Sequence, residues 1–293
     1  MKEKIKNLLE NNLINRKANA HKGSYNKVLI IGGSKEYQGA PLIVAHAALR
    51  SGVGQVRMLI HQDNIINFVY PEVTYMEYNE ENFVEIINKE FKTIIFGNGS
   101  KVTPFYINLL KTLILKYNGN LVIDATGFDI LKECGLDILK ENRKNNIFIT
   151  PHIGEFKRLF SIKQNSNDVL DFANDCSILS SKYNIYIFLK SYNCLVTYKD
   201  SSYIIEGKSP SLAKAGTGDA LAGIIGGFLS YIKDDYLATL ESAYELLLVS
   251  SLDLSNKKAC GTLTISEIID NIPSSIKKEI DNQNNLINKI LKK

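Results

Sequence analysis

The sequence lacks the features of secreted, membrane-spanning and disulfide-stapled proteins. Its four cysteines are widely separated along 293 residues with no C-x-x-C pair, which is typical of buried thiols in a reducing compartment and not of a disulfide or zinc framework. No apolar run approaches the roughly 20 residues needed to span a bilayer. The first 26 residues are rich in Lys and Asn and have no signal-peptide core. We therefore expect a cytoplasmic protein.

The chain also lacks a large excess of positive or negative charge. The 35 Lys and Arg residues are scattered among 31 Asp and Glu residues, for a net charge of +4, which argues against nucleic acid or a membrane surface as a partner. The chain has only six prolines, no Pro/Gly-rich linker and no internal repeat. We therefore expect one domain spanning residues 1–293, with an N-terminal helical arm (1–20) and a C-terminal tail helix (274–293).

Strands and helices alternate along the rest of the chain. Short runs rich in Ile, Val and Phe, bounded by turn residues, predict parallel strands that are covered on both faces. These runs are 27–31, 55–59, 93–96, 121–123, 147–149 and 186–189. Helical patterns cover 42–51, 104–117, 168–183, 237–254 and 266–271. Residues 195–198 and 203–206 predict an antiparallel hairpin. The expected fold is three-layer α/β/α with a mostly parallel central sheet.

The most informative stretch is residues 212–227, LAKAGTGDALAGIIGG, a Gly-rich turn that opens directly into an apolar helix. The start of such a helix presents unpaired N–H groups and the positive end of its dipole, where a phosphate can bind. Asp219 at this position could accept a proton from a hydroxyl that attacks the phosphate. The alternative is that Asp219 only caps the helix. Glycines at 223, 226 and 227 each cost roughly 0.5–1 kcal/mol in a helix, which predicts close packing against another element.

Small or polar residues follow nearly every predicted strand. Because ligands of open parallel sheets bind beyond the carboxyl ends of the strands, we expect one crevice to collect these residues. They are Gly32 to Ser34, Gly97 to Gly99, Asp124, Pro151 with His152 and Glu155, and Lys190. The spacing of the glycines after the first strand does not fit G-x-G-x-x-G, which excludes a Rossmann dinucleotide site.

Five segments together resemble the ADP/ATP-dependent NAD(P)H-hydrate dehydratases, which have the ribokinase-like fold. The segments are HKGSY (21–25), GAP (39–41), AALRSGVG (47–54), TPHIGE (150–155) and AGTGD (215–219). The resemblance covers residues 21 to 272. It implies a nucleotide-repair lyase: ADP or ATP phosphorylates the hydroxyl of (S)-NAD(P)HX, and loss of phosphate restores NAD(P)H.

The resemblance also implies roles for individual residues. Asp219 would be the catalytic base, and the N–H groups of Gly216, Thr217 and Gly218 would hold the transferred phosphate. The residues implied for the hydrate substrate are Ala40, Gly99, His152 and Asp219. Those implied for the nucleotide are Lys190, Ser191, Tyr192, Asn193, Cys194 and Gly218. Glu155 would bind Mg²⁺ through water. The family further implies a homo-oligomer, specifically a tetramer, and a separate NAD(P)HX epimerase as a partner activity.

Some roles stay open on the residues alone. His152 could be a structural, hydrogen-bonded histidine, and Glu155 could be an acid favoured by the dipole of its helix. Asp124 could cap the next helix or contact the hydrate pocket. For the whole chain, a ribokinase-like kinase of a vitamin precursor, of the hydroxymethylpyrimidine or hydroxyethylthiazole type, is the alternative enzyme. A nucleotide-binding module without catalysis is the alternative outside enzymes.

The sequence also departs from the family pattern. Residues 97–99 read Gly-Asn-Gly where Gly-Pro-Gly is usual, and asparagine tolerates the turn. Ser191 follows Lys190 where glycine is common, which adds a side chain beside the expected adenine site. Residues 208–211, KSPS, stand where Asn-Pro-Gly is frequent.

Overall fold

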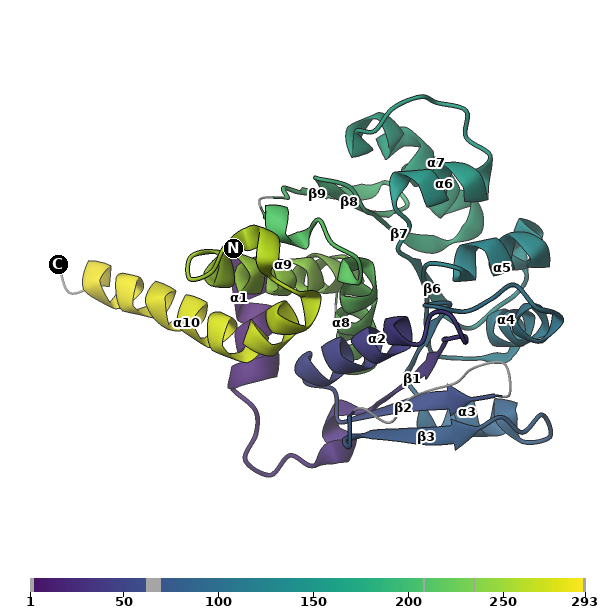
Figure 1. The fold of residues 1–293 in the computed structure, drawn as a ribbon, viewed down its shortest axis with the longest axis horizontal. Coiled ribbons are helices and arrows are strands. Elements are labelled where there is room, and N and C mark those ends of the chain that lie inside the picture. The colour runs from purple at the N-terminus through teal and green to yellow at the C-terminus, as the bar shows by residue number, and fades with distance from the viewer. Residues whose placement is uncertain (1–2, 62–69, 208, 234, 292–293) are drawn as a thin grey trace.

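The computed structural model describes residues 3–61, 70–207, 209–233 and 235–291, with side chains placed up to residue 282. In these ranges the chain forms one nine-stranded sheet of order β3-β2-β1-β4-β5-β6-β7-β8-β9 (Figure 1). The strands are β1 (Lys27–Ile31), β2 (Gln55–Ile60), β3 (Val73–Glu77), β4 (Thr93–Phe96), β5 (Asn120–Ile123), β6 (Asn146–Ile149), β7 (Ile185–Leu189), β8 (Cys194–Tyr198) and β9 (Ser201–Ile205).

The sheet is parallel from β3 to β7, and β8 and β9 are antiparallel to their neighbours. In the centre, Val28 of β1 pairs with Val56 of β2 on one side and with Thr93 of β4 on the other. At the edge, Cys194 of β8 pairs with Ile205 of β9. The predictions of a mostly parallel sheet and a terminal hairpin are confirmed.

Helices cover both faces of the sheet, as predicted. The helices are α1 (Glu3–Leu9), α2 (Gly39–Arg50), α3 (Phe83–Glu90), α4 (Pro104–Lys116), α5 (Gly127–Cys134), α6 (Ile153–Phe160), α7 (Ala173–Tyr183), α8 (Thr217–Tyr231), α9 (Tyr236–Ser255) and α10 (Ile265–Leu291). One face carries α1, α2, α8, α9 and α10, and the other carries α3 to α7 (Figure 1). Alternate residues of each strand enter separate cores: Val28 and Ile30 of β1 face α8, whereas Leu29 and Ile31 face the opposite layer.

Helix α8 packs closely against its neighbours, which confirms the prediction from its glycines. A Cβ atom on Gly223 would lie 2.4 Å from the carbonyl oxygen of Val44 in α2. A Cβ on Gly226 would lie 2.3 Å from Cδ1 of Ile95 in β4. The glycines therefore bring the backbone of α8 down onto α2 and the central strands, and this contact fixes where the helix begins.

Several elements were missed or bounded differently by the sequence pattern. Strand β3 and helix α3 were not predicted, and helices α5 and α6 were anticipated only as helices that begin near Asp124 and Glu155, without bounds. Helix is present in both predicted segments, 266–271 and 274–291, but their separation is wrong, because α10 continues through Pro273 while Ile272 and Ile276 stay buried in the core. The N-terminal arm is helical only to Leu9 and then forms a wider π-helical turn over Glu10–Ile14. Residues 1–2 and 292–293 of the two terminal predictions lie outside the described ranges. Across the described ranges, no helix is long and apolar enough to cross a membrane.

Candidate active site

The polar residues predicted to gather beyond the strands do meet at the carboxyl ends of β4 to β7. Strands β2 and β4 flank β1, so the direction of strand order reverses between β1 and β4, at one side of this group of residues. Such a switch point is where ligands of parallel sheets bind. The loops after β1 and β4 are joined there by a hydrogen bond from the N–H of Gly33 to the carbonyl oxygen of Asn98, 2.9 Å long.

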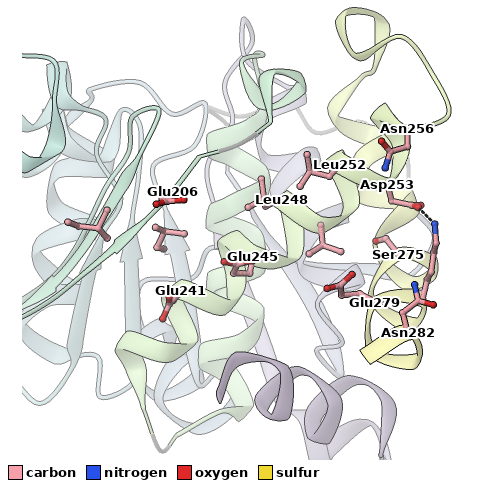
Figure 2. A pocket seen from close by; sticks show the side chains of 14 residues that line it. Glu206, Glu241, Glu245, Leu248, Leu252, Asp253, Asn256, Ser275, Glu279 and Asn282 are labelled. Carbon is pink, nitrogen blue, oxygen red and sulfur yellow. Dashed lines mark hydrogen bonds and ion pairs between the residues drawn. The ribbon is translucent and has the colours of Figure 1, made fainter. Parts of the chain in front are cut away.

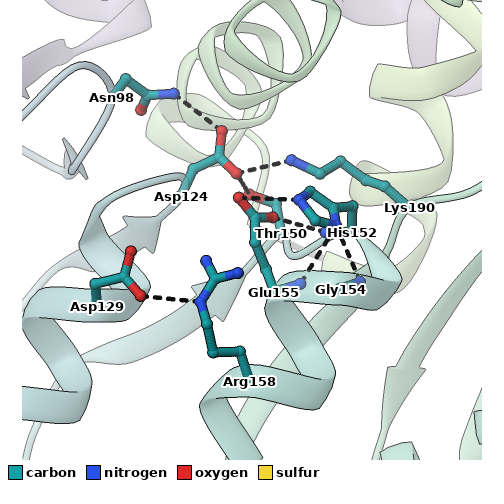
Figure 3. Close-up of polar contacts among 9 residues, drawn as sticks. All are labelled: Asn98, Asp124, Asp129, Thr150, His152, Gly154, Glu155, Arg158 and Lys190. Carbon is teal, nitrogen blue, oxygen red and sulfur yellow. Dashed lines mark hydrogen bonds and ion pairs between the residues drawn. The ribbon is translucent and has the colours of Figure 1, made fainter.

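Asp124, directly after β5, accepts hydrogen bonds from residues at the ends of β4, β6 and β7 (Figure 3). Its Oδ1 lies 2.8 Å from Oγ1 of Thr150 and 2.8 Å from Nζ of Lys190. Its Oδ2 lies 2.9 Å from Nδ2 of Asn98. No side chain caps α5, so the capping role considered for Asp124 is wrong. The carboxylate is instead the centre of a buried polar network.

Asp219 joins this network through Asn98: Nδ2 of Asn98 lies 2.7 Å from Oδ1 of Asp219. Burial and the nearby carboxylate of Asp124 together raise the pKa of Asp219 to about 6, against the hydrogen bond from Asn98 and the charge of Lys190, which lower it. Asp219 is the third residue of α8, after the cap residue Gly216, and the helix start has no side-chain cap. The capping alternative for Asp219 is therefore wrong. A carboxylate with this pKa is ionised at neutral pH and can still accept a proton readily.

The start of α8 is built to receive an anion. Gly216 turns the chain with φ +89°, in the left-handed region that favours glycine. Oγ1 of Thr217 is buried and has no hydrogen-bond partner within the described ranges. A Cβ on Gly218 would lie 3.1 Å from Nζ of Lys190, so this ammonium lies beside the helix start. Burial opposes the charge of Lys190, but the carboxylates of Asp124 and Glu155 outweigh it and the pKa of Lys190 is raised.

A cavity of about 600 Å³ opens beside this helix start. Four of the five consecutive residues expected to contact the nucleotide line it, together with Thr217 and Gly218: Lys190, Ser191, Tyr192 and Cys194. Asn193 does not line it, because its side-chain oxygen accepts a hydrogen bond from the N–H of Gly207, 3.2 Å long. The inner wall is apolar and comes from Leu212, Leu221, Tyr244 and Leu247. The cavity thus combines an apolar wall with a cation and a helix start.

Two of the residues expected at the hydrate substrate lie on the other side of the network, near α2. Gly99, with φ +71°, follows Asn98, and a Cβ on it would lie 3.1 Å from Cβ of Ala40. Neither Gly99 nor Ala40 lines the 600 Å³ cavity. Asp219 contacts the turn at 97–99 through Asn98, whereas its neighbour Gly218 lines the cavity. The carboxylate therefore lies where these two groups of residues meet.

His152 and Glu155 together cap the start of α6 (Figure 3). Nδ1 of His152 accepts hydrogen bonds from the N–H groups of Gly154 (3.0 Å) and Glu155 (3.3 Å), and Oε2 of Glu155 accepts one from the N–H of His152 (2.8 Å). This is the structural role considered for both residues. The His152 ring also lines the cavity on the side of Lys190, away from Ala40 and Gly99.

The residues present do not form a direct metal site. Among the described residues there is no group of three His, Cys, Asp or Glu side chains that could hold a metal ion. Glu155 already uses one carboxylate oxygen in the cap of α6, and the other lies 3.6 Å from Nε2 of His152. A cation here would be held by phosphate oxygens and water, with Glu155 contributing at most through water.

Sequence reasoning missed the role of Asn98, although Asn98 was noticed as a departure from the family pattern. It was interpreted through its backbone, as a residue that tolerates a tight turn. The available signal was its side chain, because an amide at a strand end can bridge two carboxylates that lie far apart in sequence. Thr150 was likewise treated only as part of a motif.

A second groove, of about 620 Å³, lies between β9, α9 and α10 (Figure 2). It shares no residue with the cavity at α8. Its lining includes five carboxylates: Glu206, Glu241, Glu245, Asp253 and Glu279. Such a lining repels phosphate, so this groove suits an anionic ligand less well than the cavity beside Lys190.

Comparison with known proteins identifies the family of the chain. The family model described as NAD(P)H-hydrate dehydratase matches residues 28–274. The ADP-dependent (S)-NAD(P)H-hydrate dehydratase of Lactococcus lactis is 27% identical over 268 residues, which cover 90% of this chain and 94% of that protein. The chain spans only about half the length, 50% to 53%, of several bifunctional NAD(P)H-hydrate repair enzymes that it also matches.

Solved structures show the same fold. The ADP/ATP-dependent NAD(P)H-hydrate dehydratase of Bacillus subtilis, co-crystallised with ATP/Mg²⁺, is 25% identical with a TM-score of 0.77, over 94% of this chain and 97% of that one. A ribokinase-like superfamily protein of Enterococcus faecalis is 23% identical with a TM-score of 0.79, over 93% and 94% of the two chains. The predicted fold and family are confirmed: the chain has the ribokinase-like fold and belongs to the NAD(P)H-hydrate dehydratase family.

Proposed function

We propose that the chain dehydrates (S)-NAD(P)HX to NAD(P)H at the expense of ADP or ATP. The observation that carries this proposal is the position of Asp219, a partly buried carboxylate with a pKa raised to about 6, at the start of α8 and beside a cavity lined by Lys190. The family membership supplies the substrate class. ADP would yield AMP and phosphate, and ATP would yield ADP and phosphate.

In the first step, Asp219 accepts the proton of the hydroxyl on the hydrated nicotinamide ring. The hydroxyl oxygen forms a bond to the terminal phosphorus of the nucleotide, and the bond from that phosphorus to the bridging oxygen breaks. Charge that develops on the transferred group is stabilised by the N–H groups at the start of α8 and by the ammonium of Lys190. The N–H groups are fixed in place before the reaction, because α8 packs directly on α2.

In the second step, phosphate leaves the ring. The lone pair of the ring nitrogen forms a double bond to the adjacent carbon as the C–O bond to phosphate breaks, and the departing phosphate accepts a proton from the next carbon, which restores the dihydropyridine. The enzyme needs no further acid or base to make phosphate a good leaving group. The protein's contribution to this step is to hold the ring and to exclude water.

The nucleotide occupies the 600 Å³ cavity, with its base against the apolar wall and its phosphates toward Lys190 and Gly218. Glu155 would contribute to binding of Mg²⁺ through water, and the cation would supply neutralisation of charge on the phosphates. The B. subtilis relative was co-crystallised with ATP/Mg²⁺. The hydrate binds on the side of Ala40 and Gly99, which leaves its hydroxyl at Asp219.

The test is recovery of absorbance at 340 nm from purified NADHX with ADP or ATP, followed in the wild type and in Asp219→Asn. We expect recovery in the wild type and a loss of roughly 10²–10⁴-fold in the variant. The chain would recover only the S epimer, so addition of a separate NAD(P)HX epimerase should raise the final absorbance. Phosphorylation of hydroxyethylthiazole or hydroxymethylpyrimidine without recovery from NADHX would favour the kinase alternative instead.

A homotetramer is proposed by analogy with the family and is tested by light scattering coupled to size-exclusion chromatography.

A further inference from the structure

Asn98 connects two carboxylates that are far apart in sequence. It follows β4, its side chain is 1% exposed, and its Nδ2 lies 2.7 Å from Oδ1 of Asp219 and 2.9 Å from Oδ2 of Asp124. An amide nitrogen carries two hydrogens, so each carboxylate can receive one. The contact to Asp219 spans 121 positions of the chain.

The orientation of this amide is determined by its partners. Ionised carboxylates only accept hydrogen bonds, so a flipped amide would place its oxygen against two carboxylate oxygens. The cost of the observed orientation is visible: Oδ1 of Asn98 is buried and has no hydrogen-bond partner in the described part of the chain. A buried polar atom left unpaired in this way points to a functional constraint on its neighbour Nδ2.

The two carboxylates do not depend equally on Asn98. Asp124 is also bound by Thr150 and by the ammonium of Lys190. For Asp219, the described residues provide no hydrogen-bond donor other than Asn98, and its Oδ2 is left without one. Asp219 also faces charges that act at longer range, from Asp124, Glu155 and Lys190.

We propose that Asn98 is a positioning residue for Asp219: it holds Oδ1, turns Oδ2 toward the substrate hydroxyl and stabilises the ionised carboxylate beside Asp124. The inference rests on the proposed function for the role of Oδ2 as the base. The effect of Asn98 on ionisation of Asp219 follows from the contact alone and can be measured without substrate.

The experiment compares Asn98→Ala with Asn120→Ala. Asn120 is a matched control, because it is a buried asparagine at the opposite end of neighbouring β5, where its Nδ2 donates to the carbonyl oxygen of Leu229. The pKa of Asp219 is read by ¹³C NMR of carboxyl-labelled aspartate, with the signal assigned through Asp219→Asn. In parallel, kcat/KM for NADHX is measured from pH 5 to pH 9.

In Asn98→Ala the pKa of Asp219 should rise by about one unit, because the charged form has lost its hydrogen-bond donor. The acid limb of the kcat/KM profile should move up equally, with a loss of about tenfold at pH 5.5 from ionisation alone. Asn120→Ala should leave both values unchanged. A merely structural role for Asn98 would instead lower kcat/KM by the same factor at every pH.

An unchanged pKa of Asp219 in Asn98→Ala would overturn the inference. If that variant does not fold, Asn98→Leu is used, which has a similar volume and no hydrogen-bond donor; no upward shift in that variant would overturn the inference as well. If the wild type restores no NADH absorbance while the pKa of Asp219 shifts as expected, the proposed function fails and the link from Asn98 to Asp219 stands.

Discussion

The ammonium of Lys190 lies 2.8 Å from Oδ1 of Asp124, with only 19% and 2% of the two side chains exposed. A pair this buried is costly to break by removing one partner, because the other is left as an uncompensated charge. Lys190 also lines the cavity proposed for the nucleotide. Its roles in stability and in binding can therefore be separated by experiment.

We expect Lys190→Met to lower the free energy of unfolding by about 3–5 kcal/mol, because the carboxylate of Asp124 stays buried without its cation. The double variant Asp124→Asn/Lys190→Met should regain much of that loss, since neither charge remains. Both variants should show a raised KM for ADP, because the phosphates have lost a cation. Urea denaturation and initial-rate kinetics measure the two effects. A double variant with normal ADP affinity would show that Lys190 does not contact the nucleotide.

The raised pKa of Asp219 should lower the stability of the folded protein at neutral pH. Its pKa is about 6 in the folded protein against 3.8 as the ordinary value. Between these two pH values the folded state therefore holds a proton that the unfolded state has released. Stability is therefore lost as pH rises from about 4 to about 6, and the loss at pH 7 amounts to about 2–3 kcal/mol. Asp219→Asn should unfold at higher urea concentration than the wild type at pH 7, and the two should converge below pH 4. If Asp219→Asn and the wild type were equally stable at pH 7 as well as below pH 4, the raised pKa of Asp219 would be contradicted.

The central sheet could be predicted because its strands are buried on both faces and therefore read as short β-branched runs. Strand β3 was missed because it lies at the edge of the sheet and only Val73 in it is fully buried, while Thr74 and Glu77 are exposed. Helix α10 was divided at Pro273, because proline usually ends a helix. The burial of isoleucines on both sides of Pro273 outweighed that preference.

The site was predictable where strand ends supply polar residues, and less so where one side chain determines another. The sequence indicates that Asp124 and Lys190 each follow a strand of the same sheet, but not that their charges pair. It presents His152 as a residue between proline and glycine, which does not reveal that its ring caps α6. Asn98 looked like a turn residue because its backbone role is local, whereas its contact with Asp219 depends on the packing of α8.

The close packing of α8 on α2 predicts a sharp contrast between two glycines. In Gly223→Ala the new methyl group would lie 2.4 Å from the backbone oxygen of Val44, which cannot move aside as a side chain can. We expect a loss of about 1–3 kcal/mol of unfolding free energy. Gly261→Ala is the control, since nothing lies within 4 Å of a Cβ at that position. Equal denaturation midpoints for the two variants would show that α8 can shift away from α2 freely.

Gly218→Ala tests the nucleotide site without disturbing the fold. The added methyl group would lie 3.1 Å from Nζ of Lys190, and this flexible side chain can yield. Alanine also favours a helix over glycine, so stability should be unchanged or slightly raised. Binding should suffer, because the methyl group and the displaced ammonium both narrow the space for phosphate. We expect the KM for ADP to rise roughly tenfold, about 1.4 kcal/mol, while the KM for NADHX changes little. The opposite pattern, with NADHX weakened and ADP unaffected, would place the hydrate beside Gly218 and would exchange the two halves of the proposed site.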